Sequence, residues 1–387
     1  MPWFVVCILL GQLTLFLDLG SRLFSSYART FRAFSLRVLP LVLCVAALTA
    51  PMELFALGVD TPLVRGLTWG TSVLSLVAFA HFLVPYRFGM RKLRTHECRD
   101  TVLPKRVLLR GVRLRVNGLP EKLDGLSCLV ISDLHCNSPR ALSRLKSTIE
   151  ASVGGGLDLV LILGDLTEKS AMLPRVIEAL SGIETRLGSF CVRGNHDLAG
   201  GRDRLIESLL AGSPIRLLPS ASHMIREAGL TVLGVESPWR ASAVPEMDSS
   251  DFSIGLTHTP DNIFKLKRAG VALCVAGHTH GGGPGLPIIG ALLVPCRYGR
   301  FLSRGVFRLG NMLLLVTSGV GYPEERLWRR GEIIRLVLEK GAPNEVCTGP
   351  LPGPRALPVD AAGTRWALSW PLEGDVRGGV QHITGGA

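Results

Sequence analysis

Three long apolar runs come first along the chain, and each approaches the length of a membrane-spanning helix. They cover residues 3–19, 38–59 and 67–86, and about 20 residues are needed to cross a hydrocarbon core of about 30 Å. The first run is the shortest and contains Gln12 and Asp18. Because no positive charge precedes it, we interpret it as a retained helix rather than a cleaved signal peptide. The pattern predicts a membrane anchor of three helices over residues 1–90.

Basic residues flank these runs unevenly. Four arginines and no acid lie between residues 20 and 37, and the segment 87–115 is densely basic. Lys and Arg favour the cytoplasmic side of a membrane. We therefore predict a multi-pass protein of the cell (inner) membrane, with its N-terminus outside and everything after residue 87 in the cytoplasm.

From about residue 107 the pattern changes to short apolar runs that end in polar or glycine-rich segments. Between several of them lie helical patterns at 140–152 and 173–187. Alternating strands and helices predict an α/β fold with largely parallel strands buried on both faces. The predicted strands lie at 126–135, 157–165, 189–197, 230–237, 252–260, 271–280 and 312–319.

The pattern divides the chain into four parts. Residues 91–125 are predicted as a basic juxtamembrane linker with the first strands, and residues 126–340 as the globular domain. Residues 341–387 are rich in Gly and Pro and lack periodicity, which is typical of a disordered tail.

The net charge of +12 is compatible with two kinds of partner, nucleic acid or an anionic membrane surface. Much of this charge lies beside the apolar runs, where anionic lipid headgroups attract it. We therefore expect a lipid bilayer as partner and no nucleic acid. The nine cysteines are scattered without a C-x-x-C pair, which favours reduced, mostly buried thiols over disulfides or a zinc knuckle.

Five of the predicted strands end in Asp, Asn or His within a few residues. Ligands bind at the carboxyl ends of strands in open α/β sheets. Side chains at i and i+2 of an extended segment share a face, so we expect Asp133 to act with His135, and His278 with His280. Each short pattern alone is compatible with an ordinary turn or cap, but five together are not. The full set is Asp133, His135, Asp165, Asn195, His196, Asp197, His258, His278 and His280.

This mixed set of carboxylates, imidazoles and an amide favours Mn, Fe or Zn. Calcium prefers oxygen ligands alone, and structural zinc prefers thiolates. The set is too large for one ion, so we predict two divalent metal ions bridged by a carboxylate.

The order D-x-H, G-D, G-N-H-D, H and G-H-x-H over residues 133–282 resembles the calcineurin-like metallophosphoesterases. With its apolar N-terminus and the segments up to 339, the chain is similar to the transmembrane metallophosphoesterase subfamily. The resemblance implies a four-layer α/β/β/α sandwich with a dinuclear site. By position, it assigns one metal to Asp133, His135 and His280, the other to Asn195, His258 and His278, the bridge to Asp165, and catalytic roles to His196 and Asp197.

These roles agree with the chemistry of phosphoester hydrolysis. Two cations that share a water lower its pKa, and a protonated His196 beside a carboxylate protonates the leaving group. Either Asp197 or Asp133 is expected to pair with this imidazole. Gly281 and Gly282 are predicted to contact substrate, since glycines 281–283 let the backbone pass close to the metals.

The chain departs from the subfamily pattern near two of these blocks. Gly283 stands where a Gln is expected, and Cys136 and Asn137 stand where many relatives have Gly. These changes affect expected substrate contacts rather than ligands. Cys136 is either a reactive thiol or a packed small residue.

The leading hypothesis is a membrane-anchored hydrolase of a lipid-linked phosphodiester or pyrophosphate. Relatives include hydrolases of UDP-2,3-diacylglucosamine, which suggests this type of substrate. The alternatives are a membrane-tethered phosphatase or phosphodiesterase of soluble substrates and a non-catalytic scaffold. In a non-catalytic scaffold some of the metal-binding residues are expected to be replaced, whereas every expected metal-binding residue is present in this sequence.

Overall fold

The described residues cover most of the predicted globular domain and part of the apolar N-terminus. Most of the first two apolar runs and nearly all of the tail lie outside them, so the predictions made there stay predictions. The computed structural model describes residues 12–13, 50–51, 54–55, 57–83, 86–87, 89–93, 101–102, 107–154, 156–240, 243–247, 252–282, 285–286, 290–291, 294–321, 331–341 and 346–347.

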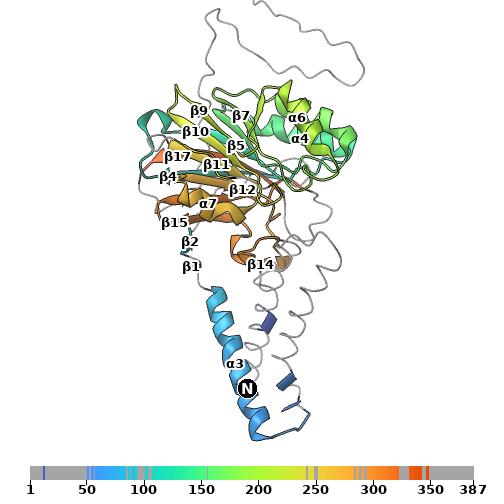
Figure 1. Ribbon diagram of the computed structural model, residues 1–387, viewed down its shortest axis with the longest axis vertical. Coiled ribbons are helices and arrows are strands. Elements are labelled where there is room, and N and C mark those ends of the chain that lie inside the picture. The colour runs from blue at the N-terminus through green and yellow to red at the C-terminus, as the bar shows by residue number, and fades with distance from the viewer. Residues whose placement is uncertain are drawn as a thin grey trace, which may run out of the picture.

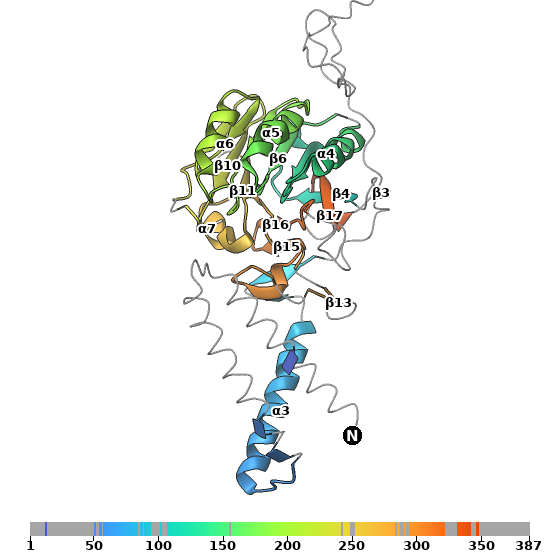
Figure 2. The same cartoon turned by 90° about the vertical axis from the view of Figure 1, so that its right-hand side faces the viewer.

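Two eight-stranded sheets form the centre of the domain (Figures 1 and 2). The first has the order β1-β2-β15-β16-β12-β11-β10-β9. Its strands are β1 (Tyr86–Arg87), β2 (Met90–Lys92), β15 (Gly305–Leu309), β16 (Met312–Val316), β12 (Leu273–Ala276), β11 (Phe252–Thr257), β10 (Leu230–Val235) and β9 (Ser222–Ile225).

The second sheet has the order β18-β4-β17-β5-β6-β7-β8, and β3 pairs with β4 outside this path. A separate pair, β13 (Gly285–Leu286) and β14 (Gly290–Ala291), follows the last histidines. The strands of the second sheet are β18 (Val346–Cys347), β4 (Val107–Val116), β17 (Gly331–Lys340), β5 (Leu126–Ile131), β6 (Leu159–Ile162), β7 (Gly188–Cys191), β8 (Ile215–Leu217) and β3 (Thr101–Val102).

Both sheets contain a run of four parallel strands together with antiparallel pairs, and in the second sheet β17 pairs antiparallel with β5 and parallel with β4. In the first sheet β10, β11, β12 and β16 run parallel, while β9, β15 and β2 pair antiparallel. In the second, β5, β6, β7 and β8 run parallel. The carboxyl ends of these parallel strands form the edge on which the predicted site residues lie.

The two packed sheets and the helices on their outer faces form four layers. Alternate side chains of both sheets form one apolar core between them, for example Val130 and Leu161 from one sheet and Leu256 and Val275 from the other. The outer face of the second sheet packs on α4 (Pro139–Ser152), α5 (Leu173–Ser181) and α6 (Arg202–Ala211). The outer face of the first packs on α7 (Ile263–Arg268). The predicted α/β/β/α sandwich is confirmed.

All seven predicted strands and both predicted helices are present, as β5, β6, β7, β10, β11, β12, β16, α4 and α5. α4 begins at an N-cap, Ser138, whose side chain accepts a hydrogen bond from Ala141 N, with a proline in the first turn. The apolar pattern did not predict the short helices α6 and α7. It also did not predict the pairing of β17 with β4, which joins the far end of the domain to a segment predicted as linker and first strands.

Helix α3 (Pro62–Leu83) extends away from the sheets (Figures 1 and 2) and covers most of the third apolar run. Within the described residues, none of the helices has both the length and the apolar character that crossing a membrane requires. β1 and β2 follow the helix, and β2 pairs with β15. The chain therefore enters the first sheet directly after α3.

Candidate active site

The predicted polar residues come together where the two sheets present the carboxyl ends of their parallel strands. Asp133 follows β5, Asp165 follows β6, and Asn195 and His196 follow β7 in one sheet. From the other sheet, His258 follows β11, and His278 and His280 follow β12. Three sets of these side chains each offer ligand atoms within 4.8 Å of one another: Asp133, His135 and His280; His135, Asp165 and His196; and Asp165, His258 and His278.

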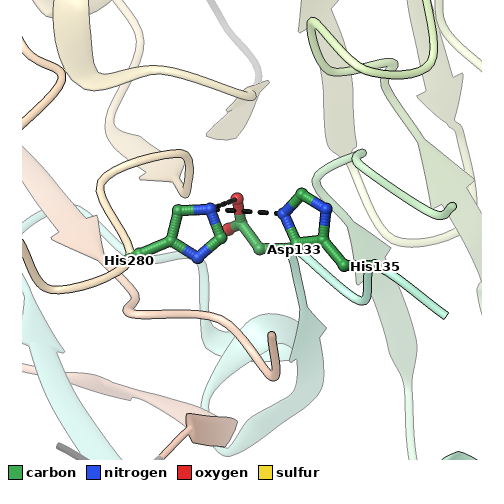
Figure 3. Close-up of side chains that lie close together, drawn as sticks. All are labelled: Asp133, His135 and His280. Carbon is green, nitrogen blue, oxygen red and sulfur yellow. Dashed lines mark hydrogen bonds and ion pairs between the residues drawn. The ribbon is translucent and has the colours of Figure 1, made fainter. Parts of the chain in front are cut away.

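Asp133, His135 and His280 form the first set, and Figure 3 shows their polar groups turned toward one another. His280 Nε2 lies 3.5 Å from Asp133 Oδ1 and 3.2 Å from His135 Nε2. The Asp133 carboxylate is fully buried. Its other oxygen, Oδ2, accepts hydrogen bonds from Ser132 Oγ at 2.6 Å and from His278 N at 3.1 Å.

Asp165, His258 and His278 form the second set, and Asn195 joins it. His258 Nε2 lies 3.2 Å from Asp165 Oδ2, 3.1 Å from His278 Nδ1 and 3.2 Å from Asn195 Oδ1. The other ring nitrogen of His258, Nδ1, donates to Leu163 O at 2.7 Å. This bond leaves the Nε2 lone pair directed at the other three groups, as in a metal-binding histidine.

Asp165 lies between the two sets. Its Oδ2 atom is 3.2 Å from His258 Nε2 and 3.9 Å from His135 Nε2. His278 and His280, only two residues apart, fall into different sets. This arrangement agrees with the bridging position implied for Asp165 and with one histidine of the pair for each cation.

The backbone at these residues is not the extended conformation that the sequence reading assumed. Positive φ angles occur at Asp133, His135, Asp165, His278 and His280, between 44° and 68°. Among the described non-glycine residues only Ser220 shares this conformation, which L-residues rarely adopt. The expectation that each pair shares a face of an extended segment is therefore wrong. Turns direct these side chains inward, and strain of this kind is typical of functional sites.

Glycines make room for the site, though not mainly the ones that were predicted. A Cβ atom on Gly194 would lie 2.1 Å from Asp165 Oδ1, and one on Gly277 would lie 2.0 Å from Ser132 Oγ and 2.7 Å from Asp133 Oδ2. These two glycines open the G-N-H-D and G-H-T-H blocks. Gly281 and Gly282 are buried with positive φ angles, and their contact with substrate stays a prediction.

The site has the properties of a cation site. Asp133 Oδ1 and Asp165 Oδ2 are buried and accept no hydrogen bond, which is costly for carboxylate oxygens unless a cation compensates. Imidazole nitrogens face these oxygens and one another at 3.1–3.9 Å. Burial opposes ionisation, yet the surrounding histidines hold the pKa values of Asp133 and Asp165 below their usual range. The donor set therefore fits two divalent cations of the Mn, Fe or Zn type.

The pKa values of the two histidines in the second set shift in opposite directions. Burial and the neighbouring His258 lower the pKa of His278 to about 3. For His258, burial acts in the same direction, but the negative charge of the neighbouring Asp165 raises the pKa to about 9. The two rings thus differ in their preferred protonation state, and a cation that binds His258 Nε2 must displace a proton from it.

The carboxylate partner of His196 is Glu168, a residue that the sequence reading did not single out. Glu168 Oε1 lies 3.2 Å from His196 Nδ1 and also contacts His135 Nδ1. Its other oxygen accepts a hydrogen bond from Asn137 Nδ2, and Asn137 Oδ1 accepts one from Glu168 N at 2.9 Å. Asn137, which departs from the usual Gly, therefore holds this carboxylate. In the sequence, the feature that could have identified Glu168 is its position three residues after Asp165.

Asp197 contacts the backbone of the loops at the site, and its predicted catalytic role stays a prediction. Its oxygens accept backbone hydrogen bonds from Asp165 N at 2.6 Å, Leu166 N at 2.9 Å and Gly194 N at 2.9 Å. The carboxylate is completely buried, and burial together with the charge of Asp165 raises its pKa to about 7. Asp197 braces the two loops that carry Asp165 and His196. Neither it nor Asp133 is the partner of the His196 ring.

Two further side chains lie near the site. Trp239 was not identified from the sequence, and for Cys136 the sequence left two alternatives open. The half-buried indole of Trp239 packs edge-on against His278, with ring centroids 4.9 Å apart, and lies 5.4 Å from His258. Cys136 packs in the apolar core under α4 and α5, and burial raises the pKa of its thiol to about 12. The packed alternative for Cys136 is therefore the one that the structure favours.

Comparison with known proteins agrees with this geometry. The sequence profile described as calcineurin-like phosphoesterase matches residues 126–282, which contain every residue of both sets. Residues 126–282 therefore belong to the calcineurin-like phosphoesterase family.

Several proteins are similar in sequence to more than half of this chain. Uncharacterized metallophosphoesterase YkuE of Bacillus subtilis is 27% identical over 214 residues, which are 52% of this chain and 74% of that protein. The transmembrane protein with metallophosphoesterase domain of Danio rerio is 26% identical over 256 residues, 59% of this chain and 56% of that protein. Phosphodiesterase YaeI of Escherichia coli is 25% identical over 218 residues, 54% of this chain and 80% of that protein.

These similarities confirm that the chain carries a phosphate-ester hydrolase domain that depends on metal ions. They leave the substrate and the N-terminal third of the chain without an assignment. For the Danio rerio protein, the match covers little more than half of its length.

Proposed function

We propose that this chain is a membrane-anchored, dinuclear-metal phosphoesterase that hydrolyses a phosphodiester or pyrophosphate bond of a lipid-linked substrate at the cytoplasmic membrane face. The observation that carries the catalytic part is the convergence of two buried carboxylates and four histidines from both sheets, with Asp165 between the two sets. A non-catalytic scaffold gives no reason to keep this costly arrangement.

Each metal-binding side chain has a defined place in this proposal. Two divalent cations, when bound, supply charge stabilisation of the phosphate oxygens and a nucleophile from water. Asp165 is the shared ligand, and the turn at Gly194 lets its carboxylate approach the histidines. The remaining ligands are Asp133, His135 and His280 on one side and Asn195, His258 and His278 on the other.

His196 is positioned as the general acid. Its Nδ1 atom is engaged by Glu168, so Nε2 is the atom that presents a proton to the leaving oxygen. The side chain is 41% exposed at the rim of the site, where a substrate can reach it.

The polarity of α3 supports the membrane part of the proposal. Between residues 62 and 77 the buried side chains are Val64, Ser72 and Ser75, and the two serine hydroxyls donate to the backbone carbonyls of Thr68 and Thr71. The exposed face of α3 is large and apolar. This is the reverse of a helix in water and is typical of a helix packed in lipid. The exposed side chains are Leu63, Leu67, Trp69, Val73, Leu74 and Val77.

Exposed apolar side chains are otherwise rare in the described residues. Beyond α3 and the residues before it, Met224 is the one large hydrophobic residue that is exposed. The basic segment after α3 supports a cytoplasmic catalytic domain. The printed name of the Danio rerio relative, a transmembrane protein with a metallophosphoesterase domain, supports the same organisation.

The lipid-linked substrate follows from the position of the domain. β2 joins the first sheet directly after α3, so the proposed anchor holds the site close to a bilayer. A substrate in that bilayer, such as UDP-2,3-diacylglucosamine, is concentrated there, and acyl chains offer binding energy remote from the phosphate.

The test is an assay of the full chain in detergent micelles loaded with Mn²⁺. Turnover of UDP-2,3-diacylglucosamine is compared with that of bis(p-nitrophenyl) phosphate, which has no acyl chain. We expect kcat/KM to be about tenfold higher or more for the diacylated substrate. Equal values would leave a tethered phosphoesterase of soluble substrates, and loss of all hydrolysis would overturn the proposed catalytic function.

A further inference from the structure

Arg202, the first residue of α6, connects two loops that meet beside the metal-binding residues. Its Nε and NH2 groups donate to His196 O at 3.0 and 2.7 Å, and its NH1 group donates to Glu168 O at 3.1 Å. These two carbonyls belong to the residues whose side chains form the His196–Glu168 pair. One guanidinium therefore bonds to the backbones of both residues. The contact between the His196 ring and the Glu168 carboxylate links the same two residues through their side chains.

Polar contacts supplement packing at His196. Its side chain is 41% exposed, and its ring packs edge-on against His135, with ring centroids 5.0 Å apart. Its backbone N–H donates to Asp165 Oδ1 at 2.9 Å, and its carbonyl is taken by Arg202. The residue is thus fixed by polar contacts on three sides: Asp165 at the amide, Arg202 at the carbonyl and Glu168 at the ring.

The local sequence is adapted to bring Arg202 back onto this loop. Gly200 and Gly201 have positive φ angles of 63° and 75° and turn the chain before α6 begins. A Cβ atom on Gly200 would lie 3.3 Å from Arg202 NH1, so the glycine leaves space for the guanidinium. A planar guanidinium with several donors reaches two carbonyls at once, whereas a lysine ammonium is a point donor on a flexible stem.

We propose that Arg202 is a positioning residue for the proton transfer to the leaving group, an inference that rests on the proposed function. It sets the distance between His196 and Glu168 and so keeps His196 Nε2 aligned with the leaving oxygen. General acid catalysis is sensitive to this alignment. Arg202 acts through the two backbones and takes no part in metal binding.

The experiment measures how the rate depends on the leaving group. Full-length protein in detergent, loaded with Mn²⁺, is assayed on two methyl phosphodiesters whose leaving groups are p-nitrophenolate and phenolate. The first leaving group departs without a proton, whereas the second benefits from one. The variants are Arg202→Met, Arg202→Lys, His196→Ala and the double variant Arg202→Met/His196→Ala. Arg204→Met is the control because Arg204 is exposed on the same helix.

For Arg202→Met we expect kcat on the phenyl ester to fall about a hundredfold, and kcat on the p-nitrophenyl ester to fall less than about threefold. Arg202→Lys recovers part of the phenyl rate, and Arg204→Met changes neither rate. Bound Mn²⁺ per chain stays at the wild-type value. Because residues that act as a unit are not additive, Arg202→Met adds little to the loss caused by His196→Ala.

Three outcomes overturn the inference: an equal fall on both esters, full additivity of Arg202→Met with His196→Ala, or loss of bound Mn²⁺ in Arg202→Met. The first and third would show a general structural defect. If wild-type protein with bound Mn²⁺ hydrolyses neither ester, the proposed function itself fails, and this inference fails with it.

Discussion

Glu168 Oε1 lies 3.2 Å from His196 Nδ1, and the same carboxylate contacts His135 Nδ1. One acidic side chain therefore contacts both His135, a proposed metal ligand, and His196, the proposed general acid. Carboxylates behind metal-bound histidines orient the ring and raise its basicity. The site thus depends on a residue outside the ligand set.

We expect Glu168→Gln to lower kcat by about 10- to 100-fold, because the amide keeps the shape but not the charge that stabilises both imidazoles. Steady-state kinetics and metal analysis check this together, since the loss at His135 also weakens metal binding. Glu178→Gln, at an exposed position of α5, is the matched control. Wild-type kinetics in Glu168→Gln would contradict the role given to this carboxylate.

Asp165→Asn is expected to abolish turnover, because the buried Oδ2 atom between His258 and His135 loses its negative charge. Bound metal per chain should fall below the wild-type value, as measured by elemental analysis of protein purified without chelators. Asp203→Asn in the first turn of α6 serves as the control. If Asp165→Asn folds and retains full activity, Asp165 does not bridge two cations.

Gly194→Ala should disrupt the site although the change is a single methyl group. The added Cβ would lie 2.1 Å from Asp165 Oδ1 and 2.7 Å from His258 Cε1. We expect loss of metal binding and a stability cost of roughly 1–3 kcal/mol from overpacking. Gly212→Ala is the control, since the nearest atom to its Cβ would be 3.9 Å away. Equal metal content in both variants would be inconsistent with the close approach at Gly194.

The buried pair of Arg193 and Glu236 connects the end of β7 to the end of β10. Arg193 NH2 donates to Glu236 Oε2 at 2.8 Å, and neither side chain is accessible. Glu236→Gln leaves a buried guanidinium without its main counter-charge, so we expect a loss of roughly 3 kcal/mol in the free energy of unfolding. Urea denaturation of the detergent-purified protein measures this loss.

The control for this pair is Glu339→Gln, which removes the partly exposed partner of Arg113. A pair in that setting contributes about 1 kcal/mol or less. Equal destabilisation by the two substitutions would show that burial does not give the Arg193–Glu236 pair its importance.

Thiol labelling at pH 8 tests whether the described cysteines are buried and unreactive. Burial raises the pKa of Cys136 to about 12, and Cys128, Cys191, Cys274 and Cys296 are buried as well. Since the thiolate is the reactive form, iodoacetamide should leave all five unmodified until the protein is unfolded. Peptide mass spectrometry reads out each site, and rapid native labelling of Cys136 would restore the reactive-thiol alternative.

The sequence by itself determined the seven central strands and the polar residues that follow them. Buried parallel strands need continuous apolar runs, and β5, β6 and β12 show this pattern within a few residues of Asp133, Asp165 and His278. Residues that end such strands lie at a common edge, so their meeting could be predicted without coordinates.

Only the tertiary structure decided how these side chains are directed and supported. Positive φ at Asp133 and His278, the contact of Glu168 with His196 and the closeness of Gly194 to Asp165 depend on loops from different strands meeting in space. No local pattern encodes such contacts, because each loop takes its conformation from hydrogen bonds to the others. The order of residues thus specified which groups form the site, and the packing of two sheets specified what each group contacts.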